Sequence, residues 1–313
     1  MSGRVVILGI YVTDLAFRAS RMPMIGETLA GSAFAMGPGG KGSNQAVAAA
    51  RAGAQVVFCT RVGKDAFGDI AHATWAAEGI TARARAVEGM ATGAAHIFVD
   101  DTTGMNAIIV AAGAAGTMEP GDADAIEVDI AASQVFVTQL EQPLGAARRG
   151  LEIARRHGVL TVFNPAPAMS LPDDIFALCD YVTPNETEAT ALTGVEIRNA
   201  DDARRAADVL LAKGAGAVIV TLGEAGALLH TRDASVLLPA FHCGPVVETA
   251  GAGDGFTGGF AAALARGDDP LTATRFGCAL AGISVTRPGT APSMPRREEV
   301  DAMLARSASA AAH

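Results

Sequence analysis

The hydrophobic and polar positions of this chain alternate between short apolar runs and longer stretches with helical spacing. Continuous apolar runs are typical of strands buried on both faces, and they occur at residues 5–8, 56–59, 135–138, 160–163, 181–182 and 217–222. Helical spacing occurs between them, at residues 67–78, 144–157, 186–192 and 201–213, with a further helix through residue 52 that Ser43 or Asn44 caps. Strands that alternate with helices predict an α/β fold with a doubly wound, mostly parallel sheet flanked by helices.

Two segments interrupt this alternation. Residues 11–36 lack helical spacing and contain Pro23, Gly26 and Gly31, while residues 94–99 and 106–110 have the pattern of a hairpin with Gly104 in its turn. We expect segments of about 11–37 and 93–111 to form a small β-sheet lid inserted in one domain spanning residues 1–313. The Ala- and Ser-rich tail at residues 307–313 is expected to be disordered.

The sequence TAGAGDGFTGGF at residues 249–260 predicts a glycine turn at the start of a helix. Gly251 and Gly253 leave out side chains where the backbone must turn tightly and approach a ligand. The free N–H groups and the positive dipole of a helix start suit phosphate oxygens. Asp254 would repel phosphate, but it is well placed to take a proton from a hydroxyl that attacks phosphorus. This combination predicts phosphoryl transfer.

The same letters allow two other interpretations. Gly253, Gly255 and Gly258 spell the dinucleotide fingerprint G-x-G-x-x-G, but they lie late in the chain, and the next acidic residues, Asp268 and Asp269, come too early for that motif. A helix start that is rich in small residues only for packing is the second alternative. A Walker A motif is excluded because neither Ser nor Thr follows the Gly-Lys pair at residues 40–41.

Charge and cysteine usage narrow the class of protein. A net charge of −9 and an isoelectric point near 5.1 argue against a nucleic-acid or membrane-surface partner. The four cysteines are scattered, without a C-x-x-C pair, which suits a reducing cytosol. The apolar run at residues 5–10 is too short for a signal sequence or a membrane span. We therefore expect a cytoplasmic protein.

Polar residues follow several predicted strands, where ligand sites of open α/β sheets gather. A second glycine loop, at residues 39–44, adds Lys41 and Asn44 as hydrogen-bond donors. Each such residue alone is more often a cap or turn residue, but their recurrence at the same end of successive strands indicates a site. The strand-end residues are Asp14, Glu141, Asn164, Asn185, Glu188, Thr221 and Gly223.

Four motifs resemble the ribokinase family of sugar kinases, in the phosphofructokinase-B superfamily, and the resemblance covers nearly the whole chain. They are GGKGSNQA at residues 39–46, NPAP at 164–167, TPNETE at 183–188 and TAGAGD at 249–254. The resemblance implies transfer of the γ-phosphoryl group of ATP to a primary hydroxyl of a furanose-like sugar, with D-ribose as the leading acceptor. It also implies Mg²⁺, a monovalent cation such as K⁺, and a homodimer that pairs through the lid.

The resemblance assigns site residues by position. Asp254 would be the base, and Gly251, Ala252 and Gly253 the anion hole. The sugar would be held by Asp14, Gly40, Lys41, Asn44 and Glu141. The nucleotide would lie along Asn185, Thr221, Gly223, Gly253 and Cys278, with Glu188 organising Mg²⁺ indirectly. The monovalent cation would be bound by Glu248, Ala250, Ser284, Arg287, Gly289 and Ser293.

Three positions depart from the family pattern. Val12 stands where the family has Asn, which removes a hydrogen-bond partner from the sugar pocket; an unpaired sugar hydroxyl there costs about 1–3 kcal/mol, or ~10- to 100-fold in ribose affinity. A nucleoside, a deoxysugar or another small polyol is therefore an alternative acceptor. Glu248 replaces Asp, which affects K⁺ dependence, and Thr257 replaces Asn. A catalytically silent sugar- or nucleotide-binding protein is a further alternative, although such a binder would not need Asp254.

Overall fold

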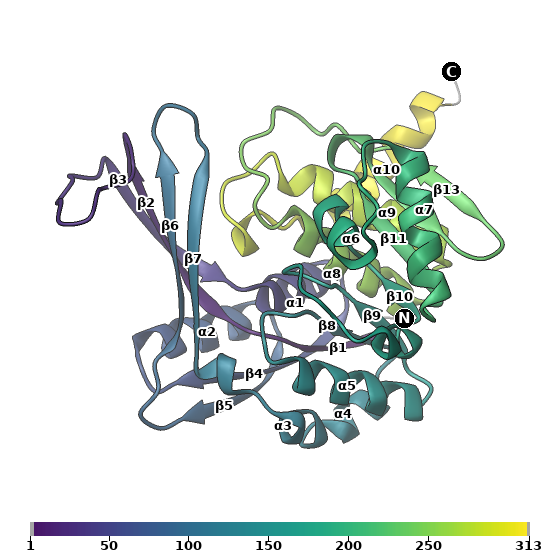
Figure 1. Cartoon of the computed structure of the whole chain (residues 1–313), viewed down its shortest axis with the longest axis horizontal. Coiled ribbons are helices and arrows are strands. Elements are labelled where there is room, and N and C mark those ends of the chain that lie inside the picture. The colour runs from purple at the N-terminus through teal and green to yellow at the C-terminus, as the bar shows by residue number, and fades with distance from the viewer. Residues whose placement is uncertain (1–2, 312–313) are drawn as a thin grey trace.

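The computed structural model describes residues 3–311 and contains one large sheet with helices on both faces and one small sheet that stands out from this body (Figure 1). The large sheet has nine strands in the order β13-β12-β11-β10-β9-β8-β1-β4-β5. All neighbours from β11 to β5 are parallel, while β12 and β13 are antiparallel additions at one edge. The expected α/β class with a mostly parallel sheet is confirmed.

The strands of the large sheet are short. They are β1 (Arg4–Leu8), β4 (Gln55–Gly63), β5 (Thr81–Val87), β8 (Val135–Thr138), β9 (Leu160–Phe163), β10 (Tyr181–Val182), β11 (Ala217–Thr221), β12 (Ala227–His230) and β13 (Ser235–Leu238). The helices are α1 (Lys41–Arg51), α2 (Ala66–Ala77), α3 (Pro120–Asp124), α4 (Glu127–Ala131), α5 (Leu144–Arg156), α6 (Glu186–Thr193), α7 (Ala200–Ala212), α8 (Ala252–Arg266), α9 (Pro270–Ser284) and α10 (Arg297–Ala311).

Side-chain alternation along β1 gives the protein two hydrophobic cores. Val5 and Ile7 pack in one core, which α1, α2, α8, α9 and α10 cover, while Val6 and Leu8 pack in the other, which α3 to α7 cover. All four side chains are fully buried. This is why the central strands are continuously apolar in the sequence.

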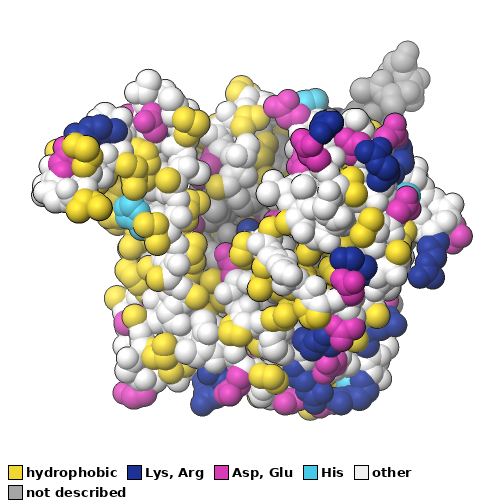
Figure 2. Space-filling model, viewed as in Figure 1, with side chains coloured by type: hydrophobic (Ala, Val, Ile, Leu, Met, Phe, Trp, Pro, Cys, Tyr) yellow, Lys and Arg dark blue, Asp and Glu magenta, His cyan; other side chains and the backbone are white. Residues whose placement is uncertain are grey.

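The small sheet, which we call the lid sheet, has the strand order β3-β2-β6-β7. Its strands are β2 (Val12–Ala19), β3 (Ala33–Gly39), β6 (Thr92–Asp100) and β7 (Asn106–Gly113). The chain leaves the large sheet after β1, forms β2 and β3, and returns directly into α1. Figure 2 shows a hollow between the lid sheet and the α/β body, with hydrophobic side chains exposed along the lid sheet.

Several elements differ from the sequence-based expectation. Helix α1 begins at Lys41 with Gly40 as its N-cap, because Ser43 and Asn44 use their side chains elsewhere; Ser43 Oγ accepts a hydrogen bond from Trp75 Nε1 at 3.0 Å. Helix α10 includes residues 307–311, which are part of the tail that the sequence analysis expects to be disordered; alanine, frequent in this tail, is the strongest helix former. Residues 312–313 lie outside the described residues. None of the helices within residues 3–311 is long and apolar enough to span a membrane.

Candidate active site

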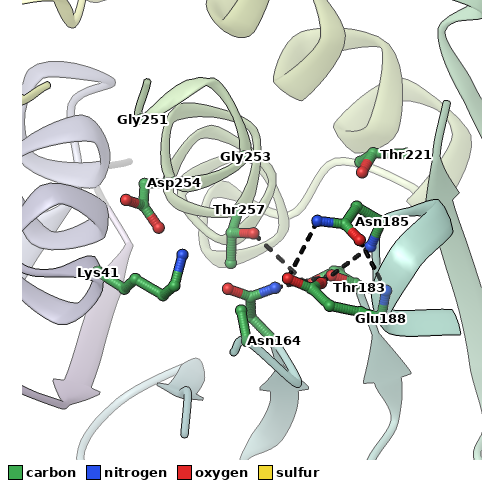
Figure 3. A pocket seen from close by; sticks show the side chains of 11 residues that line it. Lys41, Asn164, Thr183, Asn185, Glu188, Thr221, Gly251, Gly253, Asp254 and Thr257 are labelled. Carbon is green, nitrogen blue, oxygen red and sulfur yellow. Dashed lines mark hydrogen bonds between the residues drawn. The ribbon is translucent and has the colours of Figure 1, made fainter. Parts of the chain in front are cut away.

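A pocket of about 140 Å³ lies where the carboxyl ends of β9, β10 and β11 meet the first turns of α1 and α8 (Figure 3). The strand-end prediction placed polar residues at this edge, and the structure brings many of them together. The residues that line the pocket are Lys41, Asn164, Ala166, Thr183, Asn185, Glu188, Thr221, Gly251, Gly253, Asp254 and Thr257.

The turn before α8 depends on one glycine. Gly251 is the N-cap of α8 and has φ +78°, a left-handed conformation that favours glycine. A Cβ atom at this position would also lie only 3.2 Å from the Cα atom of Thr290. Gly253 has no such constraint, since φ there is not positive and a Cβ atom would meet no atom within 4 Å. The expectation that Gly253 is also needed for the turn is therefore wrong, although Gly253 does line the pocket.

The other glycines of the motif lie inside α8 and serve packing. A Cβ atom on Gly258 would lie 2.5 Å from the carbonyl oxygen of Gln45 in α1, and one on Gly255 would lie 3.1 Å from Leu280 in α9. Because Gly253, Gly255 and Gly258 are all helical, they do not form the strand-to-helix turn of a dinucleotide site. The dinucleotide interpretation is wrong, and the packing interpretation holds for Gly255 and Gly258.

Asp254 lies in the first turn of α8, is 6% exposed, and is held by two side-chain amides of α1. Asn44 Nδ2 donates to Asp254 Oδ2 at 3.0 Å, and Gln45 Nε2 donates to Asp254 Oδ1 at 3.1 Å. Burial raises the pKa of Asp254, while Lys41 and the two amides oppose that rise. The Lys41 ammonium points toward Asp254 across the pocket, and this carboxylate raises the pKa of Lys41 (Figure 3). The result is a fixed carboxylate beside a cation at a helix N-terminus.

Gln45 is a site residue that the sequence analysis missed. Its side chain is fully buried and also donates to Asn164 Oδ1 at 3.1 Å, while its own Oε1 accepts a hydrogen bond from Gln139 Nε2 at 2.5 Å. Gln45 lies within the GGKGSNQA motif, but nothing in the motif distinguishes it from a core residue until α1 is placed against α8.

The residues expected to hold an acceptor border the lid sheet. Gly40 has φ +86° and passes so close to the start of β2 that a Cβ atom would lie 2.9 Å from the backbone nitrogen of Val12 and 2.8 Å from the carbonyl oxygen of Ile10, just before the strand. The backbone N–H of Lys41 donates to Glu141 Oε2 at 2.7 Å. Asn44 Oδ1 is buried and has no hydrogen-bond partner within the described part of the chain. A buried orphan acceptor costs free energy unless a ligand donor reaches it, which fits a hydroxyl-bearing acceptor.

Two carboxyl groups here have raised pKa values. Burial raises the pKa of Asp14 to about 6, with further contributions from Asp254 and Glu248, while the hydroxyl of Thr290 opposes the rise. Burial also raises the pKa of Glu141 to about 7, against the opposing effect of Lys41. The charge of Asp254 thus contributes to the raised pKa of both Asp14 and Glu141, while Lys41 opposes the rise at Glu141 and at Asp254.

The residues expected along a nucleotide are only partly brought together. Asn185 caps α6 by accepting from the N–H of Glu188 at 2.8 Å, and both Glu188 oxygens accept hydrogen bonds from Asn185 in return. Thr221 joins these residues in the pocket. Gly223 lies just outside it in a short 3-10 turn, and Cys278 lies in the core between helices at 7% exposure, where burial raises its pKa to about 12.

The residues expected to bind a monovalent cation lie on the loop before α8, at the last residue of α9 and on the segment that follows α9. Glu248 Oε2 accepts the backbone N–H of Gly289 at 2.7 Å, which joins the loop before α8 to the loop after α9. The hydroxyls of Ser284 and Ser293 donate to nearby carbonyls, and the Arg287 side chain pairs with Glu299, so this arginine could offer only its backbone carbonyl. Ala250 directly precedes the turn at Gly251.

The family model for the pfkB family carbohydrate kinases matches residues 2–297. The chain belongs to this family. The resemblance drawn from the four motifs is thus confirmed, and this kinase transfers a phosphoryl group to an alcohol group of a carbohydrate.

Relatives and solved structures match the kinase over almost its full length. It is 39% identical over 300 residues to the ribokinase of Haemophilus influenzae, covering 96% of this chain and 97% of the relative. It is also 39% identical over 302 residues to the deoxyribokinase of Salmonella typhi, covering 96% of this chain and 98% of the relative. The structure of the Arabidopsis thaliana ribokinase with ribose and ATP is similar with a TM-score of 0.89 at 28% identity, over 97% of this chain and 99% of that one.

Proposed function

We propose that this kinase transfers the γ-phosphoryl group of ATP to the primary hydroxyl of a pentose, most simply D-ribose to give ribose 5-phosphate. The observation that carries the proposal is Asp254, a buried carboxylate at a helix N-terminus that two amides hold and a lysine faces. Relatives named ribokinase, at 35–39% identity, support D-ribose as the acceptor.

Each group of site residues has a separate role in the proposed reaction. Asp254 takes the proton of the acceptor hydroxyl, and the oxygen of that hydroxyl forms a bond to the γ-phosphorus. The bond from the γ-phosphorus to the bridging oxygen of ATP breaks, and its electron pair leaves on ADP. The N–H groups of Gly251 and Gly253, at the start of α8, and the ammonium of Lys41 stabilise the charge on the transferring group, while the N–H of Ala252, also expected in the anion hole, donates to the carbonyl oxygen of Thr249 at 3.2 Å. Asp14, Gly40, Asn44 and Glu141 hold the acceptor hydroxyls.

Mg²⁺ would come with ATP rather than from a resident metal site. Within the described residues no group of three or more His, Cys, Asp or Glu side chains could hold a metal ion. Mg²⁺ on phosphates needs only one or two protein carboxylates and keeps several waters. Both Glu188 oxygens already accept hydrogen bonds from Asn185, which fits an indirect contact through water better than direct ligation. Thr221 and Asn185 would lie along the nucleotide.

A second acceptor, 2-deoxyribose, is favoured by Val12. Strand alternation places Val12 and Asp14 on the same face of β2, and Val12 is only 2% exposed. It packs with Ile10, Ala95 and Ala115, so an apolar surface lies beside the carboxylate expected to hold the sugar. A relative at 39% identity is named deoxyribokinase.

Three further features belong to the proposal. A monovalent cation would bind at the loops joined by Glu248 and Gly289. A homodimer would form through the lid sheet, where Phe17, Phe34, Met36, Ile108 and Ile109 are 41–65% exposed (Figure 2). Cytoplasmic location is supported by four cysteines that all remain unpaired.

An ADP-release assay with Mg-ATP and K⁺ tests the proposal against ribose, deoxyribose, fructose, adenosine, cytidine and pseudouridine. Turnover mainly on ribose would support ribokinase activity, and turnover mainly on deoxyribose would make Val12 the specificity residue. Turnover only on a nucleoside or fructose would overturn the pentose assignment. Silence with every acceptor, in a folded protein that binds ATP, would overturn it as well.

A further inference from the structure

The loop after α9 contacts the lid sheet through one hydroxyl group. Thr290 Oγ1 lies 3.0 Å from the carbonyl oxygen of Pro38 in β3 and 3.3 Å from Asp14 Oδ2 in β2. The two lid strands are thus joined to one residue that lies more than 250 positions away along the chain. A hydroxyl has a single proton, so it donates to either acceptor in turn.

Thr290 also contacts the start of α8. The nearest atoms to a Cβ atom built on Gly251 would be the Cα and Cβ atoms of Thr290, at 3.2 and 3.3 Å. Thr290 therefore lies between the acceptor carboxylate on one side and the turn that opens the anion hole on the other.

The loop that carries Thr290 is fixed to the α/β body. Arg51 Nη1 in α1 donates to the carbonyl oxygens of Ala291, Pro292 and Met294 at 3.3, 3.1 and 2.6 Å. Ser293 Oγ donates to the carbonyl oxygen of Thr290 at 2.7 Å, and the N–H of Gly289 is held by Glu248. The hydroxyl of Thr290 is thus presented from a rigid support, whereas its two acceptors belong to the lid sheet.

We propose that Thr290 is a positioning residue that latches the lid sheet to the body and sets Asp14 for the acceptor. The proposal rests on the proposed function in that Asp14 binds the acceptor. The Asp14 carboxylate is otherwise surrounded by acidic groups, because Asp254, Glu248 and Glu141 all face the same region. The hydroxyl of Thr290 is the hydrogen-bond donor that reaches it from the body, and it favours the charged form that accepts sugar hydroxyls.

The experiment compares three variants. Thr290→Val keeps the shape and removes the hydroxyl, and Thr290→Ser restores a hydroxyl. Thr286→Val is the matched control, because Thr286 lies on the same loop and its hydroxyl donates only to the local carbonyl of Ile283 at 2.7 Å. Thr290→Val is expected to raise the acceptor KM about 3- to 10-fold, as expected for one lost hydrogen bond, with the ATP KM unchanged. Thr290→Ser should stay near wild type, as should Thr286→Val.

The rise in the acceptor KM caused by Thr290→Val must also depend on Asp14. In an Asp14→Asn background the further change Thr290→Val should add little to the acceptor KM, because the coupled partner is already altered. In wild type the acceptor KM should rise as the pH falls through about 6, where Asp14 is protonated, and Thr290→Val should shift that rise to higher pH. Equal acceptor KM values and equal pH profiles in Thr290→Val and Thr286→Val would overturn the proposal.

A second measurement needs no acceptor and so separates this proposal from the proposed function. Backbone hydrogen exchange of residues 33–39, in the protein without ligands, should be faster in Thr290→Val than in wild type or Thr286→Val, because the bond to Pro38 is lost. Unchanged exchange there would overturn the latch even if the sugar assays succeed. Faster exchange would support the latch even if the acceptor is not a pentose.

Discussion

The side-chain amide of Gln45 lies 3.1 Å from Asp254 Oδ1 and, through the same nitrogen, 3.1 Å from Asn164 Oδ1. One fully buried glutamine of α1 therefore ties the carboxylate at the start of α8 to the end of β9. Its acceptor oxygen is occupied by Gln139, so the amide cannot flip without losing hydrogen bonds. The orientation of Asp254 is set by this network as much as by α8 itself.

Replacement of Asp254 with Asn should lower kcat at least ~10²-fold, the low end for loss of a positioned proton acceptor, while leaving ATP binding largely intact. The expected reason is that an amide cannot take the hydroxyl proton. Turnover and ATP binding would be measured on the same sample, with a melting curve to establish folding. Near-wild-type turnover in a folded Asp254→Asn protein would refute the base assignment.

Replacement of Gln45 with Leu should move the acidic limb of the pH profile of kcat to higher pH. The amide of Gln45 stabilises the ionised form of Asp254, so its loss adds to the effect of burial and raises the pKa of Asp254 further. Gln142→Leu is the control, since Gln142 is a buried glutamine that donates to Thr138 and Gln139 and does not contact Asp254. A drop in activity at all pH values, without a shift of the limb, would mean that Gln45 is only structural.

The sequence patterns predicted the central strands well because those strands are buried on both faces. The runs at residues 135–138 and 160–163 match β8 and β9 residue for residue. The pattern missed β5 (Thr81–Val87), whose alternating Ala and Arg at the sheet edge lack a long apolar run, and the β12–β13 hairpin. Strands β5 and β13 are the two edge strands of the sheet, where β5 has no buried residue and β13 has one, so neither has a continuous buried run. Strand β12, next to β13, is buried along its whole length.

The candidate site was predictable where the chemistry lies in a local motif. Asp254 and the turn at Gly251 follow from residues 249–254 alone. Gln45 and Thr290 act on residues more than 200 positions away, so no local pattern reveals them. Cys278 and Gly223 were carried over by position, and the structure leaves both outside the described lining of the pocket. Site residues that act through contacts between helices, or between the lid sheet and the body, could be identified only in the folded structure.

Replacement of Glu141 with Gln should stabilise the ligand-free protein at pH 8. The pKa of Glu141, about 7, lies above its usual 4.5, so the folded chain binds this proton more tightly than the unfolded chain. The stability linked to this group is therefore fully present below pH about 4.5 and is lost as the pH rises through 7. We expect a gain of about 1–3 kcal/mol in the free energy of unfolding at pH 8 and little gain at pH 4.

Urea unfolding of the wild type and the Gln variant at both pH values measures this gain. Glu196→Gln serves as the control, because Glu196 is exposed and its pKa is lowered by Arg198, so loss of its charge should not stabilise. Equal stability of wild type and Glu141→Gln at pH 8 would contradict the raised pKa. Glu141→Gln should also bind the acceptor more weakly, because a carboxylate that is placed for binding lowers the free energy of unfolding of the ligand-free protein.

Turnover should be higher in K⁺ than in tetramethylammonium at equal ionic strength, and Glu248→Gln should remove most of that difference. One Glu248 oxygen is occupied by the N–H of Gly289, which leaves the other oxygen and the negative charge for a cation. A glutamine can keep the bond to Gly289 but supplies no charge. Glu299→Gln is the control, because Glu299 pairs with the Arg287 side chain on the same loop. Equal wild-type turnover in K⁺ and in tetramethylammonium would contradict the cation site and would mean that turnover needs no K⁺ beside Glu248.

Replacement of Val12 with Asn should raise kcat/KM for ribose relative to deoxyribose about 10-fold. The asparagine amide would offer a partner to a sugar hydroxyl that the apolar Val12 leaves unpaired, and one such bond is worth about 1–2 kcal/mol. The two side chains are similar in volume, so the close packing of Val12 against Gly93 should tolerate the change. Val12→Ala controls for shape, since it removes apolar volume without adding an amide. If Val12→Asn and Val12→Ala leave the ratio of ribose to deoxyribose unchanged, the apolar side chain at residue 12 does not contact the distinguishing hydroxyl, and selectivity must lie with Asp14, Asn44 or Glu141.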